Sequence, residues 1–448
     1  MRALVVLAAF SGLLVLAVMH PQVGLFAWGW LTLMQPHREV WGLGNANLNL
    51  IVAVVTIVIW LFSQEPKKPL GEPTTVLIIL FMVWMGVCQL YSLRPEHSWY
   101  HFNQFIRVMV FIYVSLVLIR TKARIHAMVF VLCISIGYYA VKGGVFTLLT
   151  GGAYHVVGPV MTIIGDRNHL GGAAVFILPL LNYLRMQTEA RWIRILFLFA
   201  IALTVVCVLG THSRGALIAL VLVAVPFWWR SRHRLMLAVV LLPLAFGAVS
   251  FMPEQWSARM ETIETADTDA SFQGRIDAWV IATKIALGNP LTGAGFRVAY
   301  LQDVADAYLS EPRQARAAHS IYFEILGSMG FVGLALFMSI IALAFWNASW
   351  IRHHTKDQVG LQWARDLASM AQISLIAYCI AGAALSLEFW EGPWLMFVIL
   401  ARLRHEIAAA SIKSKSAVNN ARKWYMEPLP HDSADGGGAA QGANIPRC

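Results

Sequence analysis

The segment Ala317-Ala318-His319-Ser320-Ile321-Tyr322 marks the point where a long polar stretch meets an apolar run. Residues 252–318 before it carry many charged side chains, and residues 320–346 after it are predominantly apolar. An apolar run of ~20 residues is long enough to cross the hydrocarbon core of a bilayer. His319 is therefore predicted where water meets lipid, in the first turn of a membrane helix and beneath a large loop.

The composition extends this membrane prediction to the whole chain. Of its 448 residues, 58% are hydrophobic and 13% are charged, whereas soluble domains carry ~25% charged residues. The mean hydropathy is +0.63, and apolar runs recur along the length of the sequence. We predict an all-α polytopic membrane protein with about 12 transmembrane helices and one large external loop that contains short helices.

Basic residues set the predicted orientation. They cluster in alternate connections between the apolar runs, and such connections face the cytoplasm; the clusters lie at 120–124, 185–191, 230–234, 352–356 and 402–422. The loop 252–318 then lies on the opposite side. Four regions follow: a transmembrane bundle at 1–251, the loop at 252–318, further transmembrane helices at 319–405, and a cytoplasmic, largely disordered tail at 406–448. Within the first region, residues 3–34 form a helix broken near His20-Pro21, because proline removes a helix hydrogen bond.

Two composition signals exclude other classes of protein. The net charge of +10 is explained by cytoplasmic lysine and arginine, so nucleic acid is not predicted as a partner. Of five cysteines, none lies in the loop 252–318. Neither a disulfide framework nor a cysteine-rich metal site is therefore available there.

Several arginines are exceptions to the preference of basic residues for the cytoplasmic side, because they lie at the external ends of predicted spans. They are Arg38, Arg94, Arg167 and Arg214. An arginine at mid-bilayer costs ~2.5–3.5 kcal/mol on insertion scales, so such residues face a wet cavity or a partner. Together they predict a basic pocket for an anion, since the planar guanidinium binds phosphate through two parallel hydrogen bonds. The alternative is that each side chain reaches out to lipid headgroups.

The external loop contains its own pattern. Gly274-Arg275 leads into an apolar-periodic stretch at 279–287, which is followed by Gly288-Asn-Pro290 and Gly293-Ala-Gly295. This pattern predicts a short amphipathic helix on the outer membrane face with a Gly/Pro stop, and Arg275 at its start near the cavity mouth. The pair Asp267-x-Asp269 resembles a metal-binding acid pair. It has no second acid cluster beside it, so we favour a solvated turn and predict no metal.

His319 is the predicted catalytic base. At a helix start, the positive end of the helix dipole lowers the pKa of an imidazole and keeps it neutral. Glu388 and Glu391 follow the next span and could orient the histidine or pair with an arginine. The spacing of Gly327, Gly330 and Gly333 predicts close packing of the helix that His319 opens. The alternative is an interfacial histidine that only hydrogen-bonds a carbonyl.

In their order and placement, these features resemble the O-antigen ligase/polymerase superfamily. The resemblance rests on Ser213-Arg214-Gly215-Ala216 opening a span, Gly274-Arg275 with Trp279, Pro290-x-x-Gly293-x-Gly295, and His319-Ser320-x-Tyr322 before a glycine-rich helix. It covers residues 160–345 by motif. The segment Gly165-Asp-Arg-Asn168-His is similar to an asparagine-containing signature of the superfamily, although Arg167 and His169 stand where small residues are expected.

The resemblance, closest to the O-antigen ligase branch, implies a function. Such a protein is an inverting, metal-independent membrane glycosyltransferase of GT-C-like type in the bacterial inner membrane, with its active site in the periplasm. It needs no cofactor, and it moves O-antigen from undecaprenyl diphosphate to lipid A-core oligosaccharide. Carried over, His319 is the base and Arg214 and Arg275 hold the diphosphate. Besides donor and acceptor, membrane lipids are the expected partners.

Other functions remain open at this point. An O-antigen polymerase or a protein O-glycosylation ligase would use the same lipid-linked donor with another acceptor. A lipid-linked oligosaccharide flippase or other transporter would instead carry polar residues along the whole bundle, in both leaflets. The charges of this chain gather toward the predicted outer side, which favours an enzyme.

Overall fold

The computed structural model describes residues 2–40, 42–44, 46–69, 71–230, 247, 253–254, 256, 270–309 and 313–426. Across these residues the regular structure is helical and contains no strand. Five helices are long and apolar enough to cross a membrane. The predicted all-α polytopic membrane fold is therefore confirmed, while the count of about 12 crossings stays a prediction.

The helices follow the predicted spans in order. They are α1 (Arg2–Met19), α2 (Pro21–Leu33), η1 (Pro36–Glu39), α3 (Leu48–Phe62), α4 (Pro73–Leu90), α5 (Pro95–Leu118), α6 (Lys122–Leu149), α7 (Arg167–Gln187), α8 (Arg191–Gly210), α9 (Arg214–Arg230), α12 (Ala270–Gly288), η3 (Val298–Tyr300), α13 (Gln302–Tyr308), α14 (Ile321–His354), η4 (Val359–Leu361), α15 (Gln362–Gly382) and α16 (Glu391–Met426). The apolar run at 235–251, within the predicted bundle 1–251, lies outside the described residues except for residue 247. Residues from His405 onward form a separate unit.

Proline sets the starts of several helices. The first apolar region is broken as predicted, because α1 ends at Met19 and α2 begins at Pro21. Pro73 and Pro95 likewise occupy the first positions of α4 and α5. At that position the missing N–H is not needed and the fixed φ angle suits a helix. α5 consequently begins ten residues before the apolar run at 105–119, because its first turns are polar.

Helix α14 is broken at Gly330, which has φ 66° and ψ −168°. The loop that follows α12 pairs with the broken backbone, because the N–H of Phe331 donates to the carbonyl of Pro290 at 2.8 Å and the N–H of Ala294 donates to the carbonyl of Gly327 at 2.9 Å. A continuous helix with close-packing glycines was predicted here. The prediction of continuity is wrong, because Gly330 opens the helix instead of extending it.

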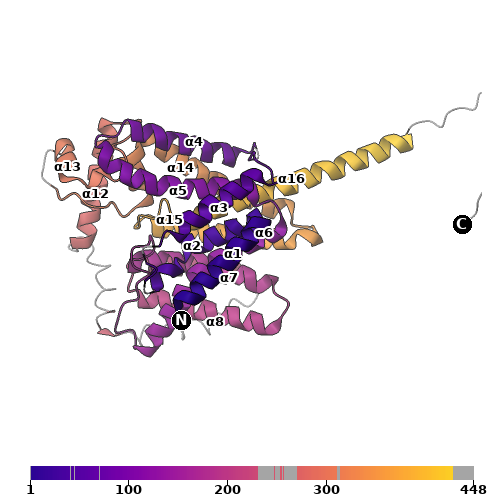
Figure 1. Ribbon diagram of the computed structural model, residues 1–448, viewed down its shortest axis with the longest axis horizontal. Helices are drawn as coiled ribbons and strands as arrows, with labels where there is room; N and C mark the ends of the chain where they lie inside the picture. The colour runs from indigo at the N-terminus through magenta and orange to yellow at the C-terminus, as the bar shows by residue number, and fades with distance from the viewer. Residues whose placement is uncertain are drawn as a thin grey trace, which may run out of the picture. The chain divides into compact units, whose positions relative to one another are not determined.

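The break leaves other backbone carbonyls without helical partners, and side chains of α4 reach them. The indole Nε1 of Trp84 donates to the carbonyl of Met329 at 3.2 Å, and Cys88 Sγ lies 3.9 Å from the same oxygen. In an apolar surrounding an unpaired carbonyl costs several kcal/mol, so these contacts make the broken helix tolerable. Figure 1 shows α4, α5 and α14 running side by side, with α12 and α13 gathered at one end.

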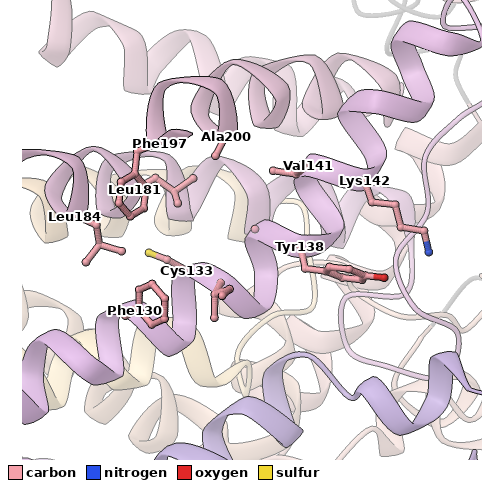
Figure 2. Close-up of a pocket in the computed structure, with 11 residues that line it drawn as sticks. Phe130, Cys133, Tyr138, Val141, Lys142, Leu181, Leu184, Phe197 and Ala200 are labelled. Carbon is pink, nitrogen blue, oxygen red and sulfur yellow. The ribbon is translucent and has the colours of Figure 1, made fainter. Parts of the chain in front are cut away.

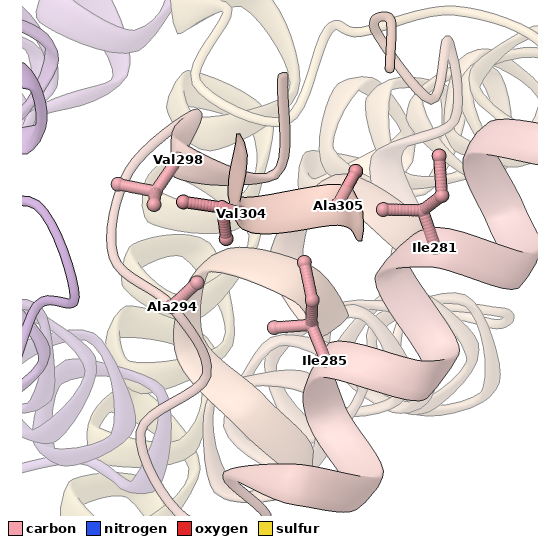
Figure 3. Close-up of a cluster of buried hydrophobic side chains, with 6 residues drawn as sticks. All are labelled: Ile281, Ile285, Ala294, Val298, Val304 and Ala305. Atoms are coloured by element: carbon pink, nitrogen blue, oxygen red, sulfur yellow. The ribbon is translucent and has the colours of Figure 1, made fainter. Parts of the chain in front are cut away.

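A small hydrophobic cluster holds the segment between α12 and α14 in place (Figure 3). Its six buried members are Ile281, Ile285, Ala294, Val298, Val304 and Ala305. They come from α12, from the loop after it, from η3 and from α13. A seven-residue helix such as α13 is not stable alone in water. This cluster therefore supplies the packing that keeps α13 and the loop against α12.

We predict that Gly330→Ala destabilises the protein. A Cβ at this position would collide with the carbonyl oxygens of Leu291 and Pro290, and a left-handed backbone costs an L-residue ~1–2 kcal/mol besides. The melting temperature of the detergent-purified variant should fall clearly below that of wild type. Gly86→Ala on α4 is the matched control, because a Cβ there meets nothing within 4 Å. Equal melting temperatures for the two variants would contradict the structural role of the break.

Candidate functional site

One cavity of about 200 Å³ brings together the residues that carry chemistry. It lies where the start of α7, the early turns of α12, the segment before α14 and the turn after α15 meet. Its lining consists of Asp166, Asn168, Arg275, Arg316, His319, Ala384 and Leu385. Three predicted site residues, His319, Arg275 and Asn168, are thus brought together from segments far apart in the sequence.

His319 lies two residues before α14, outside its first turn, because Ser320 is the N-cap and Ile321 is the first helical residue. Its backbone has φ 46°, in the left-handed region. The carbonyl of the preceding Ala318 accepts a hydrogen bond from Trp279 Nε1 at 2.7 Å. The ring of Trp279 stacks on Phe323 at 4.9 Å. These contacts from α12 hold His319 at the cavity wall.

The pKa of His319 is lowered, and burial is the main cause. The positive charge of Arg275, which α12 carries, is the second cause. The negative charges of Glu324 and Asp166 raise the pKa and partly offset this shift. A neutral imidazole in this position can accept a proton at physiological pH.

Two guanidinium groups lie in the cavity wall. Arg275 comes from α12, and Arg316 comes from the extended segment that leads to His319. Arg316 lies against Gly274, where a Cβ would meet its guanidinium. Arg316 was not identified from the sequence, because it lies among both acidic and basic residues of the loop. Its position became clear only from the fold, in which it lies beside Gly274.

The start of α7 forms the opposite wall. Asp166 is the N-cap residue, and its Oδ1 accepts a hydrogen bond from the backbone N–H of Asn168 at 2.8 Å. Burial opposes ionisation of Asp166, but hydrogen bonds from Asn168 and the nearby His169 leave its pKa below the ordinary value. His169 Nδ1 lies 4.0 Å from Asp166 Oδ1, and the rings of His169 and His319 are 6.5 Å apart. An aspartate before a helix is a capping signal, and it could have identified Asp166.

Arg167 and Arg214 lie next to the cavity without being part of its lining. Arg167 is the first residue of α7, between the lining residues Asp166 and Asn168. Arg214 is the first residue of α9, which Ser213 caps through a hydrogen bond from the N–H of Ala216. A Cβ on the next residue, Gly215, would lie 3.8 Å from the Cβ of the lining residue Ala384.

Arg38 and Arg94 lie outside the cavity lining and have protein partners. Arg38 Nη1 donates to the carbonyl of Met161 at 2.8 Å. Arg94 forms an ion pair with Asp303 of α13 at 2.6 Å, and the two side chains are 50% and 59% exposed. The hydrogen bonds from Arg94 lower the pKa of Asp303. The structure therefore assigns both arginines a local bonding role and does not bring them to His319.

The acidic side chains behind the cavity are bound to neutral groups. Glu324 Oε1 accepts hydrogen bonds from Tyr300 at 2.6 Å and from Ser386 at 2.8 Å. Glu388 is buried, and its Oε2 has no hydrogen-bond partner among the described residues. Burial raises the pKa of Glu388, and the charge of Glu324 adds to this shift. Glu391 is also buried, at the first position of α16.

In the part of the chain that the structure describes, no group of three or more His, Cys, Asp or Glu residues could hold a metal ion. Asp267 and Asp269 lie outside that part. Metal independence therefore stays a prediction.

A larger cavity of about 420 Å³ lies between α6, α7 and α8 (Figure 2). Its lining is almost wholly apolar and includes Phe130, Ile134, Leu181 and Phe197. Lys142 lies at its edge and pairs with Glu39 at 3.1 Å. A site for charged substrates needs several polar groups that converge on one point. The smaller cavity at His319 has them, so we take it as the candidate active site.

Two families match the chain. Residues 197–338 match the family model described as O-antigen ligase. Residues 1–189 match a family of unknown function (DUF5935). No curated protein matches the chain. The first match confirms the resemblance to the O-antigen ligase/polymerase superfamily, and its range contains Arg275, Arg316 and His319. The match supports glycosyl transfer of the ligase/polymerase type as the activity class of this domain.

We predict that His319 titrates below the ordinary histidine value of ~6.5. Diethyl pyrocarbonate modifies only neutral imidazole, so peptide-level mass spectrometry of its reaction between pH 5 and 8 gives the midpoint for His319. Arg275→Gln should move the midpoint upward, because a cation that disfavours the imidazolium is removed. Lys284→Gln, at an exposed position of the same helix, should leave it unchanged. A wild-type midpoint at or above 6.5 would contradict this electrostatic description.

Proposed function

We propose, on the premise of the O-antigen ligase match, that this protein transfers an O-antigen glycan from undecaprenyl diphosphate to lipid A-core oligosaccharide on the periplasmic face of the bacterial inner membrane. The observation that carries the proposal is the cavity in which Arg275 and Arg316 face the neutral imidazole of His319. It pairs an anion-binding wall with a base, which are the two things this reaction needs.

The donor is proposed to place its diphosphate against Arg275 and Arg316. The two guanidiniums, that of the half-buried Arg275 and that of the exposed Arg316, supply positive charge where the leaving group gains negative charge. Their planar forks match phosphate oxygens bidentately. Arg214, which begins the adjacent helix α9, is proposed to add to this positive field. The polyprenyl chain would remain in the lipid beside the bundle.

His319 is proposed to accept the proton of the acceptor hydroxyl. The hydroxyl oxygen attacks the anomeric carbon, the bond from that carbon to the phosphate oxygen breaks, and the proton passes to the imidazole. Undecaprenyl diphosphate leaves with the bonding electron pair, and attack opposite to it inverts the anomeric configuration. A sugar hydroxyl is too weakly acidic to react well without a base, which is why a neutral His319 matters.

The start of α7 is proposed to orient the sugar. Asn168 offers a carboxamide, which is both a donor and an acceptor for hydroxyl groups. The carboxylate of Asp166 accepts hydrogen bonds and carries negative charge opposite the arginines. This polarity favours one orientation, with the diphosphate at the α12 side and the sugar ring at the α7 side of the cavity.

The periplasmic placement is supported by the charge pattern of the sequence. Basic residues gather where α5 ends and α6 begins, with Arg120 in the connection and Lys122 and Arg124 in the first turn of α6. Connections rich in lysine and arginine face the cytoplasm. The lipid acceptor is supported by the ligase description of the matched family.

We predict that His319→Ala lowers the transfer rate by ~10²–10⁴-fold, the usual contribution of a general base. The assay uses purified protein in EDTA with undecaprenyl-diphosphate glycan and lipid A-core, and follows product by gel mobility. His353→Ala, at an exposed position far along α14, should keep wild-type turnover. Near-normal turnover of the His319 variant would exclude it as the base. Products with ladders of added glycan on the donor lipid, instead of on lipid A-core, would assign the protein as a polymerase.

We predict that lysine cannot replace arginine at position 275. Arg275→Ala should raise the KM for donor and lower kcat, and Arg275→Lys should recover little, because lysine is a point charge without the guanidinium fork. Lys284→Ala on the exposed face of α12 serves as the matched cation control. Full recovery by Arg275→Lys would argue against bidentate binding of phosphate.

A further inference from the structure

Arg297 holds a backbone conformation that its residue type disfavours. Its φ is 55°, in the left-handed region. The same loop uses glycine at its two other left-handed positions, Gly293 with φ 63° and Gly295 with φ 97°. Such a conformation costs an L-residue ~1–2 kcal/mol that glycine avoids. An arginine at this third position therefore needs a reason beyond the fold of the loop.

The guanidinium of Arg297 has aromatic neighbours and no anionic ligand. It lies 5.4 Å from the ring centre of Phe105 on α5 and 5.8 Å from that of Tyr300. Its Nε is buried and makes no hydrogen bond, and no ion pair joins it to any acid among the described residues. A buried N–H without an acceptor is unfavourable, because it loses the hydrogen bond that water gave it.

Two buried acids, Glu324 and Glu388, form no ion pair with Arg297. Glu324 Oε1 already accepts hydrogen bonds from Tyr300 and Ser386. For Glu388, burial and the charge of Glu324 raise the pKa in spite of Arg297, which favours the protonated carboxyl. The described residues therefore offer the buried Nε of Arg297 no acceptor.

The contacts of the loop place Arg297 beside the cavity of His319. The preceding Phe296 donates its N–H to Ser98 Oγ at 3.0 Å, which fixes the loop to the start of α5. Tyr300, on whose ring Arg297 lies, bonds to Glu324 in the first turn of α14, one turn beyond His319. The charge of Arg297 also lowers the pKa of His319, although burial and Arg275 have larger effects.

We propose that Arg297 is a further donor-binding residue, whose missing acceptor is a phosphate of the lipid-linked diphosphate. The inference rests on the proposed function, since it assigns the anion that Arg275 and Arg316 would share. Phe105 and Tyr300 hold the guanidinium plane in position before the ligand arrives, and the phosphate oxygens supply the acceptors that the protein does not. The strained backbone at Arg297 is then retained for binding rather than for stability.

The decisive variant is Arg297→Gly, because it separates strain from binding. Glycine relieves the left-handed strain, so the melting temperature should stay equal to that of wild type or rise. Loss of a charge-assisted phosphate contact should weaken binding of undecaprenyl diphosphate without glycan about 10- to 100-fold. Binding is measured with radiolabelled lipid on detergent-purified, full-length protein. A structural role predicts the opposite pattern, with a lower melting temperature and unchanged affinity, and would overturn the proposal.

Two controls match the two effects. Met161→Gly relieves a left-handed residue with φ 61° that is 83% exposed, and it should leave affinity unchanged. Arg297→Lys keeps charge but not the planar fork, so it should recover affinity only in part.

The binding assay needs no acceptor and no transfer. If wild type binds the diphosphate lipid but transfers nothing, the proposed function fails and the role of Arg297 stands. If Arg297→Gly binds like wild type, only the role of Arg297 fails. If wild type does not bind the lipid, both are wrong.

Discussion

The break of α14 at Gly330 is the constraint on which the site depends. A helix opened within apolar surroundings must have its freed backbone groups bonded again. Here the loop after α12 and the side chains of α4 meet that requirement. The same bonds fix α12 against the first part of α14, and so they hold Trp279 and Arg275 over His319. Backbone hydrogen bonding thus determines where the charged side chains lie.

Charge and burial act together at the cavity. The arginine that is positioned to attract an anion also lowers the pKa of the neighbouring His319, so one arrangement favours both a bound diphosphate and a neutral base. Burial strengthens each effect, because interactions between charges are larger where water is excluded. Arg94 shows the contrast, since it is half exposed and paired with Asp303. An arginine near the predicted membrane boundary is therefore not by itself a ligand of substrate.

Sequence reasoning found the elements with strong local signals. Pro21 predicted the division between α1 and α2, Gly288 the end of α12, and the apolar runs most helices. It also found His319, Arg275 and Asn168, which line one cavity. It missed the early start of α5, whose first turns are polar. It also missed the break at Gly330, because a glycine in an apolar run has the same pattern whether the helix continues or opens.

What the sequence by itself determined was the class of the protein: a helical membrane bundle with a histidine at the edge of a polar loop. Apolar length and proline position act locally, so they can be recognised without knowing what packs where. Which arginines serve the histidine was decided only by the tertiary structure. Arg38 and Arg94 bond to Met161 and Asp303, whereas Arg316 enters the cavity past Gly274. A guanidinium binds whatever acceptor the fold brings within ~3 Å, and those acceptors come from segments distant in the chain.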